Sequence, residues 1–148
     1  MSLSQQLNEA MKEAMRAKDS LRLNTIRQIR TSVKNKEIDE RRELDDQEII
    51  GVISTLVKQR KESAQLYREG GRPDLAEKEE QEMAVLQEFL PAQLGEEEIR
   101  SIIEEAVIET GAASMKDMGK VMKVVTGRTL GRADGRLVSE LVKVRLSA

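Results

Sequence analysis

Cysteine, histidine and tryptophan are absent from this chain of 148 residues, and its only aromatic side chains are Tyr67 and Phe89. Without cysteine the protein can form no disulfide bond and has no thiolate nucleophile. Without histidine it lacks the usual acid–base group of neutral pH and the commonest metal ligand. We therefore predict no catalytic residues, no metal site and no cofactor. The scarcity of aromatic rings also argues against recognition of single-stranded nucleic acid by base stacking.

Long apolar stretches are missing as well. No run of about 18 apolar residues is present, as a membrane-spanning helix would need. The first residues also lack a basic segment followed by an apolar one, which is the pattern of a secretory leader. The sequence therefore predicts a cytoplasmic protein with no membrane partner.

Only two prolines interrupt a sequence that is 35% charged and has a mean hydropathy of −0.52. Apolar residues recur at helical spacing, and no alternating strand pattern of useful length is present. Pro91 disfavours helix at the residue before it and marks the best boundary. We predict an all-α protein with an N-terminal domain of about four helices with long arms (residues 1–91) and a compact C-terminal three-helix module (residues 92–148).

Start and stop signals place the individual helices. Asp19 and Asp45 are suitable N-caps, with Glu48 completing a capping box at the second of them. Pro73 suits the first turn of the next helix. The pattern fades between 37 and 42, where we expect fraying. The predicted helices are 3–17, one after Asp19, one from Asp45 to about 70, 73–91, 96–110, 115–126 and 135–146.

The net charge of −2 conceals a segregated distribution of charge. Residues 1–36 carry a net charge of +5, residues 73–114 carry −10, and residues 115–148 carry +5. Both ends of the chain are therefore basic, and the middle is acidic.

The basic C-terminal segment has the clearest pattern for binding. In a helix capped by Ser114, with Asp117 as its acidic partner, three lysines fall within about 60° of one another, opposite the apolar side chains. Gly127 is predicted to end this helix. A basic, glycine-bearing turn and a second helix start follow. The candidate RNA-binding residues are Lys116, Lys120, Lys123, Arg128, Arg132 and Arg136. The alternative is that the lysines form only a solvated face.

A second basic patch is possible in the N-terminal domain. Its candidate members are Arg27, Arg30, Lys34, Lys58, Arg60 and Lys61. Here internal ion pairs are an equally good interpretation, because Arg60 and Arg72 lie near acidic helices that carry Asp74 and Glu79.

Seven segments, in order and over nearly the whole length, resemble the YqeY family, whose sequences are similar to the C-terminal tail of the GatB subunit of tRNA-dependent amidotransferases. They are Leu21–Ile29 (LRLNTIRQI), Val33–Ile38 (VKNKEI), Lys58–Ala64 (KQRKESA), Gly71–Glu82 (GRPDLAEKEEQE), Phe89–Leu94 (FLPAQL), Lys116–Lys123 (KDMGKVMK) and Gly131–Gly135 (GRADG).

The resemblance implies an all-helical fold and, through Lys116–Lys123 and Gly131–Gly135, a tail that contacts tRNA. It also carries a label of carbon–nitrogen ligase activity with glutamine as amido-N-donor. The residues do not support that activity in this chain alone. Glutamine hydrolysis needs an activated thiolate or serine, and ligation needs ATP, yet the chain has no cysteine and no GxxxxGK[ST] loop.

We therefore predict a non-catalytic protein that binds tRNA or another structured RNA through the phosphate backbone. The alternative is a helical adaptor whose long N-terminal arms dock a protein, such as an amidotransferase or an aminoacyl-tRNA synthetase.

Overall fold

The computed structural model describes all 148 residues, and they form seven α-helices, one short 3₁₀ turn and no strand. The prediction of an all-α protein is confirmed. The chain divides into two compact units, Met1–Leu90 and Pro91–Ala148, each with a hydrophobic core of its own. No helix is both long enough and apolar enough to cross a lipid bilayer.

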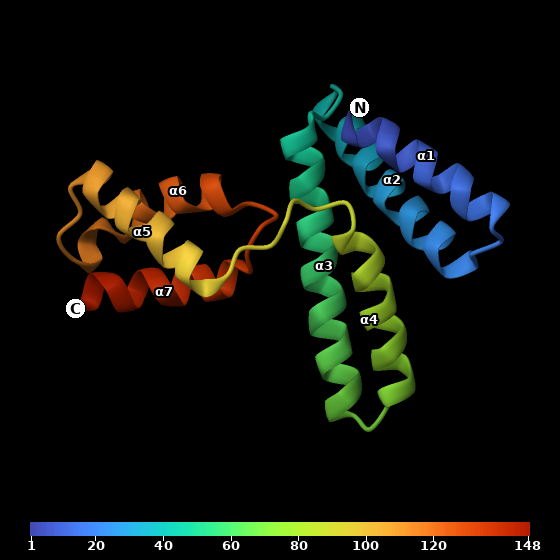
Figure 1. Ribbon diagram of the computed structural model, residues 1–148. Helices are drawn as coiled ribbons and strands as arrows, with labels where there is room; N and C mark the ends of the chain where they lie inside the picture. Colours follow the sequence, from blue (N-terminus) through green and yellow to red (C-terminus); the bar gives the residue numbers. More distant parts are fainter. The chain divides into compact units, whose positions relative to one another are not determined.

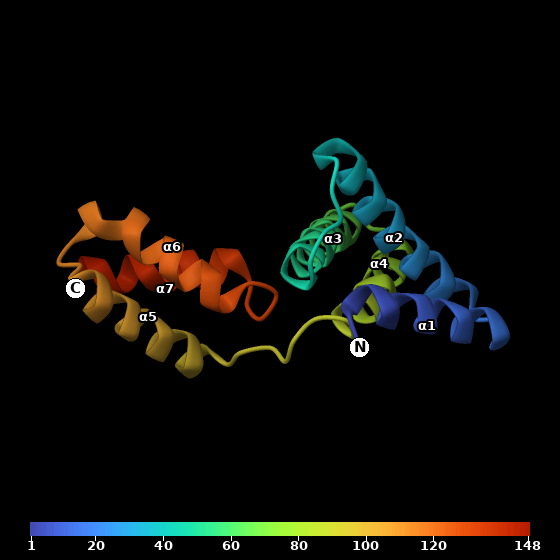
Figure 2. The same ribbon diagram turned by 90° about the horizontal axis from the view of Figure 1, so that it is seen from above.

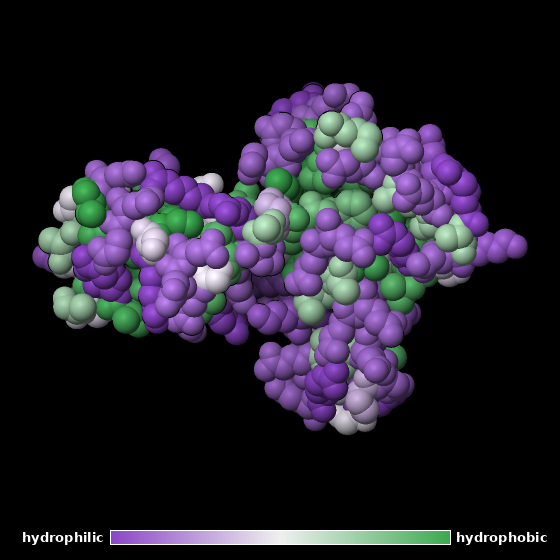
Figure 3. All heavy atoms as spheres, in the orientation of Figure 1, coloured by the Kyte–Doolittle hydropathy of each residue, from purple (hydrophilic) through white to green (hydrophobic).

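The first unit consists of two helical pairs. Helices α1 (Leu3–Arg16) and α2 (Ser20–Glu40) form one pair, and α3 (Asp46–Glu69) and α4 (Pro73–Gln87) form the other. Figure 1 shows α4 running beside α3 in the opposite direction, and Figure 2 shows the same two helices nearly end-on and next to each other. These two helices form a long hairpin, whose closed end is covered by hydrophilic side chains on the face shown in Figure 3.

Local capping interactions explain where these helices begin. The Asp19 side chain accepts a hydrogen bond from the backbone N–H of Arg22, and Asp45 accepts one from Glu48. The Glu48 carboxylate in turn accepts a hydrogen bond from the Asp45 N–H, which completes the predicted capping box. Pro73 occupies the first turn of α4, where its missing N–H costs nothing.

The expectation of fraying between 37 and 42 is wrong. Helix α2 continues to Glu40 and ends where Arg41 adopts a left-handed conformation with φ of 56°. A contact beyond the helix holds its last turn in place, because Glu37 Oε2 accepts a hydrogen bond of 2.9 Å from the N–H of Leu44. The polar composition of this segment gave no sign of that contact.

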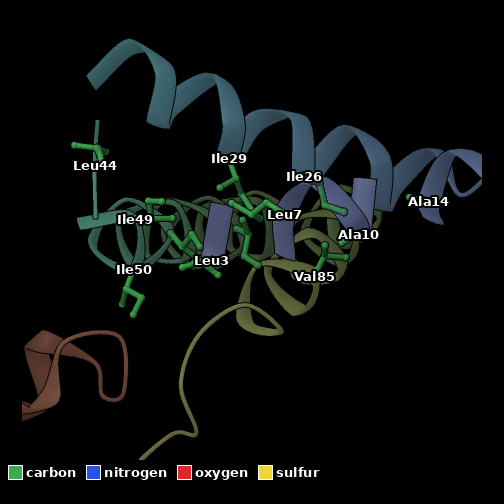
Figure 4. Close-up of a cluster of buried hydrophobic side chains, with 12 residues drawn as sticks. Leu3, Leu7, Ala10, Ala14, Ile26, Ile29, Leu44, Ile49, Ile50 and Val85 are labelled. Carbon is green, nitrogen blue, oxygen red and sulfur yellow. The ribbon is translucent and has the colours of Figure 1, made fainter. Parts of the chain in front are cut away.

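The core of the first unit lies where α2 crosses the other helices. Ile26, Ile29, Ile53 and Leu86 are fully buried there, and Leu7 is nearly so. In Figure 4, the side chains of Leu7, Ile26 and Ile29 point into the space between α1, α2 and the hairpin. Aliphatic side chains from four helices therefore join both pairs into one unit.

The second unit is a three-helix module. It contains α5 (Glu96–Thr110), the 3₁₀ turn η1 (Met115–Asp117), α6 (Met118–Thr129) and α7 (Gly135–Ser147). The module has its own buried aliphatic core, drawn from all three α-helices. The core consists of Ile99, Ile103, Ala106, Val107, Val121, Val125, Val138, Val142 and Leu146.

The prediction that Gly127 ends its helix is wrong. Helix α6 continues through Gly127 to Thr129, and Leu130 caps it. The buried stripe of Val121 and Val125 extends to Thr129, which is only 4% exposed and donates a hydrogen bond to the Val125 carbonyl. The left-handed residue of the following turn is Gly131, with φ of 73°. Packing therefore extends the helix past a glycine that also suited its end.

Candidate nucleic-acid interface

The lysines of η1 and α6 lie on the side of the module away from its core. Lys116, Lys120 and Lys123 are all exposed, whereas Val121 and Val125 on the opposite side of α6 are fully buried. Lys120 is 69% exposed, and its Nζ lies 3.9 Å from Asp117 Oδ1. Lys116 and Lys123 form no ion pair within the module. The outer face of α6 therefore carries positive charge that the fold leaves largely uncompensated.

Asp117 fixes the start of this basic helix. Its Oδ2 accepts hydrogen bonds from the backbone N–H groups of Ala113, at 2.9 Å, and Ser114, at 3.4 Å. The Ser114 side chain in turn accepts one from the N–H of Lys116, which confirms the predicted cap. These hydrogen bonds, that from Ala113 foremost, hold the pKa of the Asp117 carboxyl below its usual value, with a smaller contribution from Lys120. Asp117 is therefore kept ionised, with one oxygen bound to the backbone and the other 3.9 Å from Lys120 Nζ, and it stands as one negative charge beside three lysines.

The arginines that follow are used differently. Arg128 projects to α5, where Nη2 lies 2.6 Å from Glu109 Oε2 and Nη1 lies 3.6 Å from Glu105 Oε2. Arg145 of α7 pairs with Glu104, which also lies on α5. The hydrogen bond from Arg145 to Glu104 raises the pKa of the Arg145 guanidinium above its usual value. The acidic side of α5 thus takes two arginines and leaves the lysines of α6 free. Of the six candidate cations, Arg128 pairs with two carboxylates of α5, and Lys120 lies 3.9 Å from Asp117.

Arg132 and Arg136 lie at the turn between α6 and α7, where the chain from the domain boundary also runs. The N–H of Leu94 donates a hydrogen bond of 2.7 Å to the Arg132 carbonyl, and Gln93 Nε2 donates one of 2.8 Å to the Gly131 carbonyl. Arg132 is half-buried and Arg136 is exposed at the start of α7. The FLPAQL and GRADG segments, about 40 residues apart, therefore meet, and Gln93 holds the basic turn in place.

The second basic patch does not form one surface on α3. Arg60 faces inward, 18% exposed, with Nε 2.7 Å from Glu82 and 3.5 Å from Glu79. It also donates a hydrogen bond to the side chain of Gln28 on α2. Lys58 is exposed on nearly the opposite side of α3, because residues two apart are about 160° apart round a helix. The alternative of internal ion pairs describes Arg60, with Glu79 as one partner.

The remaining members of that patch are exposed. On α2, Arg27 and Lys34 point to solvent, and Arg30 Nη1 lies 2.8 Å from the sulfur of Met11. On α3, Lys61 is exposed and engaged in an interaction of its own. Arg72, the other arginine considered for internal pairing, lies 3.3 Å from Asp74. The structure therefore leaves Arg27, Lys34 and Lys58 as separate surface cations.

A family model described as Yqey-like protein matches residues 4–146. The chain belongs to this family. The match includes both units, and the resemblance inferred from the seven segments is confirmed.

Curated relatives of this Yqey-like protein come from fungi. "Altered inheritance of mitochondria protein 41, mitochondrial" of Vanderwaltozyma polyspora is 44% identical over 85 residues, which are 57% of this chain and 46% of the relative. The protein of the same name from Eremothecium gossypii is 41% identical over 87 residues, covering 58% and 48%. That from Pyrenophora tritici-repentis is 32% identical over 143 residues, covering 93% and 77%. The matched region spans about half the length of the first two relatives.

These relatives correct one prediction. The sequence predicted a cytoplasmic protein, but the relatives are named as mitochondrial proteins, so the cytoplasmic prediction is contradicted. The prediction rested on the lack of an apolar leader. Mitochondrial targeting segments are amphipathic and basic, so that criterion is blind to them. The names of the relatives state no reaction and no ligand.

Sequence reasoning missed two features of the candidate interface. Gln93, which supports the basic turn, stood in a segment interpreted as a boundary and as part of the family resemblance, but not as part of the candidate interface. Gly119 and Gly127 both belong to α6, one in its first turn and one in its last, on the side of the lysines. Their position follows from the helical period once the helix is known to extend to Thr129.

The structure holds no group of three or more acidic side chains placed to bind a metal ion.

Proposed function

We propose that this Yqey-like protein is a non-catalytic protein that binds structured RNA, with tRNA as its ligand, through the C-terminal module. One observation carries the proposal: Lys116 of η1 and Lys120 and Lys123 of α6 are exposed in one row, while the neighbouring arginines pair with α5. Arg128 pairs with Glu105 and Glu109, and Arg145 with Glu104. Exposed lysines in a row suit a phosphate backbone, which carries a regular series of negative charges.

The absence of aromatic residues from the module supports recognition of backbone and shape. Tyr67 and Phe89 both lie in the first unit. Single-stranded RNA is usually bound by stacking bases on aromatic rings, whereas folded RNA is recognised through its phosphates, hydroxyls and shape. The names of the relatives suggest mitochondria as the setting in which such an RNA would be met.

Binding of the purified full chain to bulk tRNA over a salt series tests the proposal, with an equal mass of duplex DNA for comparison. Each phosphate contact contributes about 0.7–0.9 to the slope of log K against log salt. The double variant Lys120→Glu/Lys123→Glu should therefore lower the slope by about 1.4–1.8 and weaken binding in 0.1 M salt by about 25-fold or more. No tRNA binding by the wild-type chain at low salt would refute the proposal.

A matched variant separates the local effect from that of net charge. Lys78 on α4 and Lys143 on α7 are exposed and lie off the proposed face. The variant Lys78→Glu/Lys143→Glu changes the net charge equally, and we expect it to bind tRNA within about threefold of the wild type, because neither lysine belongs to the row on η1 and α6 that contacts phosphate in the proposal. An equal loss in both variants would mean that the α6 face is not the contact.

A helical adaptor remains the second candidate, since Ile38 on α2 and Leu66 on α3 are 64% and 67% exposed. Exposed apolar side chains on the first unit suit a protein partner such as an amidotransferase or an aminoacyl-tRNA synthetase. The lysine reversals on α6 would leave such docking intact. Pull-down with wild-type and reversed chains therefore distinguishes the two functions.

A further inference from the structure

Two glycines interrupt the side chains on the outer face of α6. Gly127 follows Lys123 by one helical turn, and Gly119 immediately precedes Lys120. With about 100° per residue, both fall on the half of the helix surface that carries Lys116, Lys120 and Lys123. All five residues are exposed. The outer face of α6 thus exposes bare helix backbone at Gly119 and at Gly127, one turn before and one turn after Lys123, and we call these two positions with the lysines beside them the bare strip.

Nothing within the fold requires glycine at these two positions. A Cβ built on Gly119 or on Gly127 would meet no atom within 4 Å, so neither glycine makes room for a neighbouring helix. Neither has a positive φ, unlike Gly71, Gly111 and Gly131. Glycine inside a helix lowers its stability relative to alanine, and α6 has two of them among its 12 residues. No contact within the chain offsets this loss of helix stability.

We propose that the lysine-flanked bare strip of α6 takes the sugar–phosphate backbone of a folded RNA directly against the helix main chain. This inference rests on the proposed function and adds the mode of contact. Without side chains at Gly119 and Gly127, a ribose–phosphate chain reaches the helix surface at these two positions. The flexible lysines beside the two glycines reach its phosphates. Lysine suits this role because its ammonium group adapts to phosphates at various positions.

The charge of the strip selects this occupant over a partner helix. Small residues also permit close packing of two helices, but such contacts are apolar at their centre. Here the centre of the face carries three ammonium groups, of which only Lys120 has an acid within 4 Å. A polyanionic chain supplies the missing counter-charges along its whole length. The strip therefore requires no particular base sequence, only a backbone of suitable curvature.

Filling the strip without changing its charge tests the inference. The double variants Gly119→Ala/Gly127→Ala and Gly119→Gln/Gly127→Gln add side chains of good helix formers. Because open space surrounds both positions, we expect the thermal midpoint of the alanine variant to be unchanged or a few degrees higher. In the same variants, tRNA affinity should fall, by about threefold with alanine and about tenfold with glutamine, as phosphates are held away from the lysines.

Gly51 supplies a matched control. It lies inside α3, and a Cβ there would also meet nothing within 4 Å. Gly51→Ala and Gly51→Gln should leave tRNA affinity unchanged, with the same rise in stability for alanine.

The outcomes separate this inference from the proposed function. One outcome is that the wild type binds tRNA, that the Lys120/Lys123 reversal abolishes binding, and that the α6 glycine variants bind as tightly as the wild type. In that case the contact with the bare strip is refuted and RNA binding stands. If the wild type does not bind tRNA, the proposed function fails and the inference fails with it. Lower affinity together with an unchanged or higher thermal midpoint in the alanine variant supports the inference even if the glutamine variant is less stable.

Discussion

Replacement of Arg60 by methionine tests whether the second basic patch is a structural feature or a binding surface. Arg60, Glu79 and Glu82 are only 18%, 20% and 13% exposed, and the guanidinium also donates to Gln28 on α2. Glu79 Oε2 lies 3.5 Å from Arg60 Nε and accepts no hydrogen bond. Removing the arginine would leave two partly buried carboxylates facing each other without a counter-charge.

The magnitude follows from this burial. Removing one partner of a fully buried ion pair costs about 3–5 kcal/mol, and the residual exposure of this cluster reduces the cost to about 2–3 kcal/mol. A unit of 90 residues has a total stability of roughly 5–13 kcal/mol, so the loss is a large fraction of it. Urea denaturation of the full chain, followed by far-UV circular dichroism and by hydrogen exchange of α2–α4 amides, measures the change. The same Arg60→Met variant should keep the tRNA salt slope of the wild type.

Arg68 on the same α3–α4 hairpin provides the control. It pairs with Glu80 at 2.6 Å, but the two side chains are 51% and 39% exposed. Arg68→Met should therefore cost less than about 1 kcal/mol. Equal small losses for Arg60→Met and Arg68→Met would refute the structural role of Arg60. A loss of tRNA affinity in Arg60→Met comparable to that of the α6 lysine reversal would restore the second patch as a binding surface.

Two further predictions concern stability. Val125→Ala truncates a fully buried side chain of the C-terminal module and should lower the free energy of unfolding by about 2–3 kcal/mol. Hydrogen exchange should become faster in α5–α7 and stay unchanged in α1–α4. Equal acceleration in both units would show that the two cores unfold together. The hydrogen bond from Arg42 lowers the pKa of Glu48 to about 2 from 4.5, so its contribution to stability is present above pH 4.5 and is lost as the pH falls towards 2. Glu48→Gln should flatten the dependence of urea-denaturation midpoints on pH in that window, and a wild-type profile in the variant would contradict this assignment.

The helices of this protein could be predicted because their signals are local. The Asp45–Glu48 capping box, Pro73 at a first turn and the stripe of Val121 and Val125 each involve residues within one or two turns of each other. The errors arose where a contact beyond the end of the helix, or burial in the folded core, decided the outcome. Helix α2 extends to Glu40 because Glu37 bonds to Leu44, and α6 extends past Gly127 because Thr129 is buried.

The candidate site was predictable only in part, for a related reason. The sequence placed Lys116, Lys120 and Lys123 on one side of a helix, because helical spacing alone determines which residues share a face. It could not tell which cations would be neutralised. Arg128 is held by α5 and Arg60 by α4, each across about 20 residues of sequence, and such pairing depends on side chains that only folding brings within about 4 Å.

The sequence by itself determined the family, the helical class and the amphipathic character of α6, since these depend on composition, order and short-range periodicity. Tertiary structure alone decided that Arg60 is an internal ion-pair partner, that Gln93 supports the turn at Gly131, and that Gly119 and Gly127 face open space. The physical reason is that the environment of a side chain is set by the elements packed around it, and those come from distant parts of the chain.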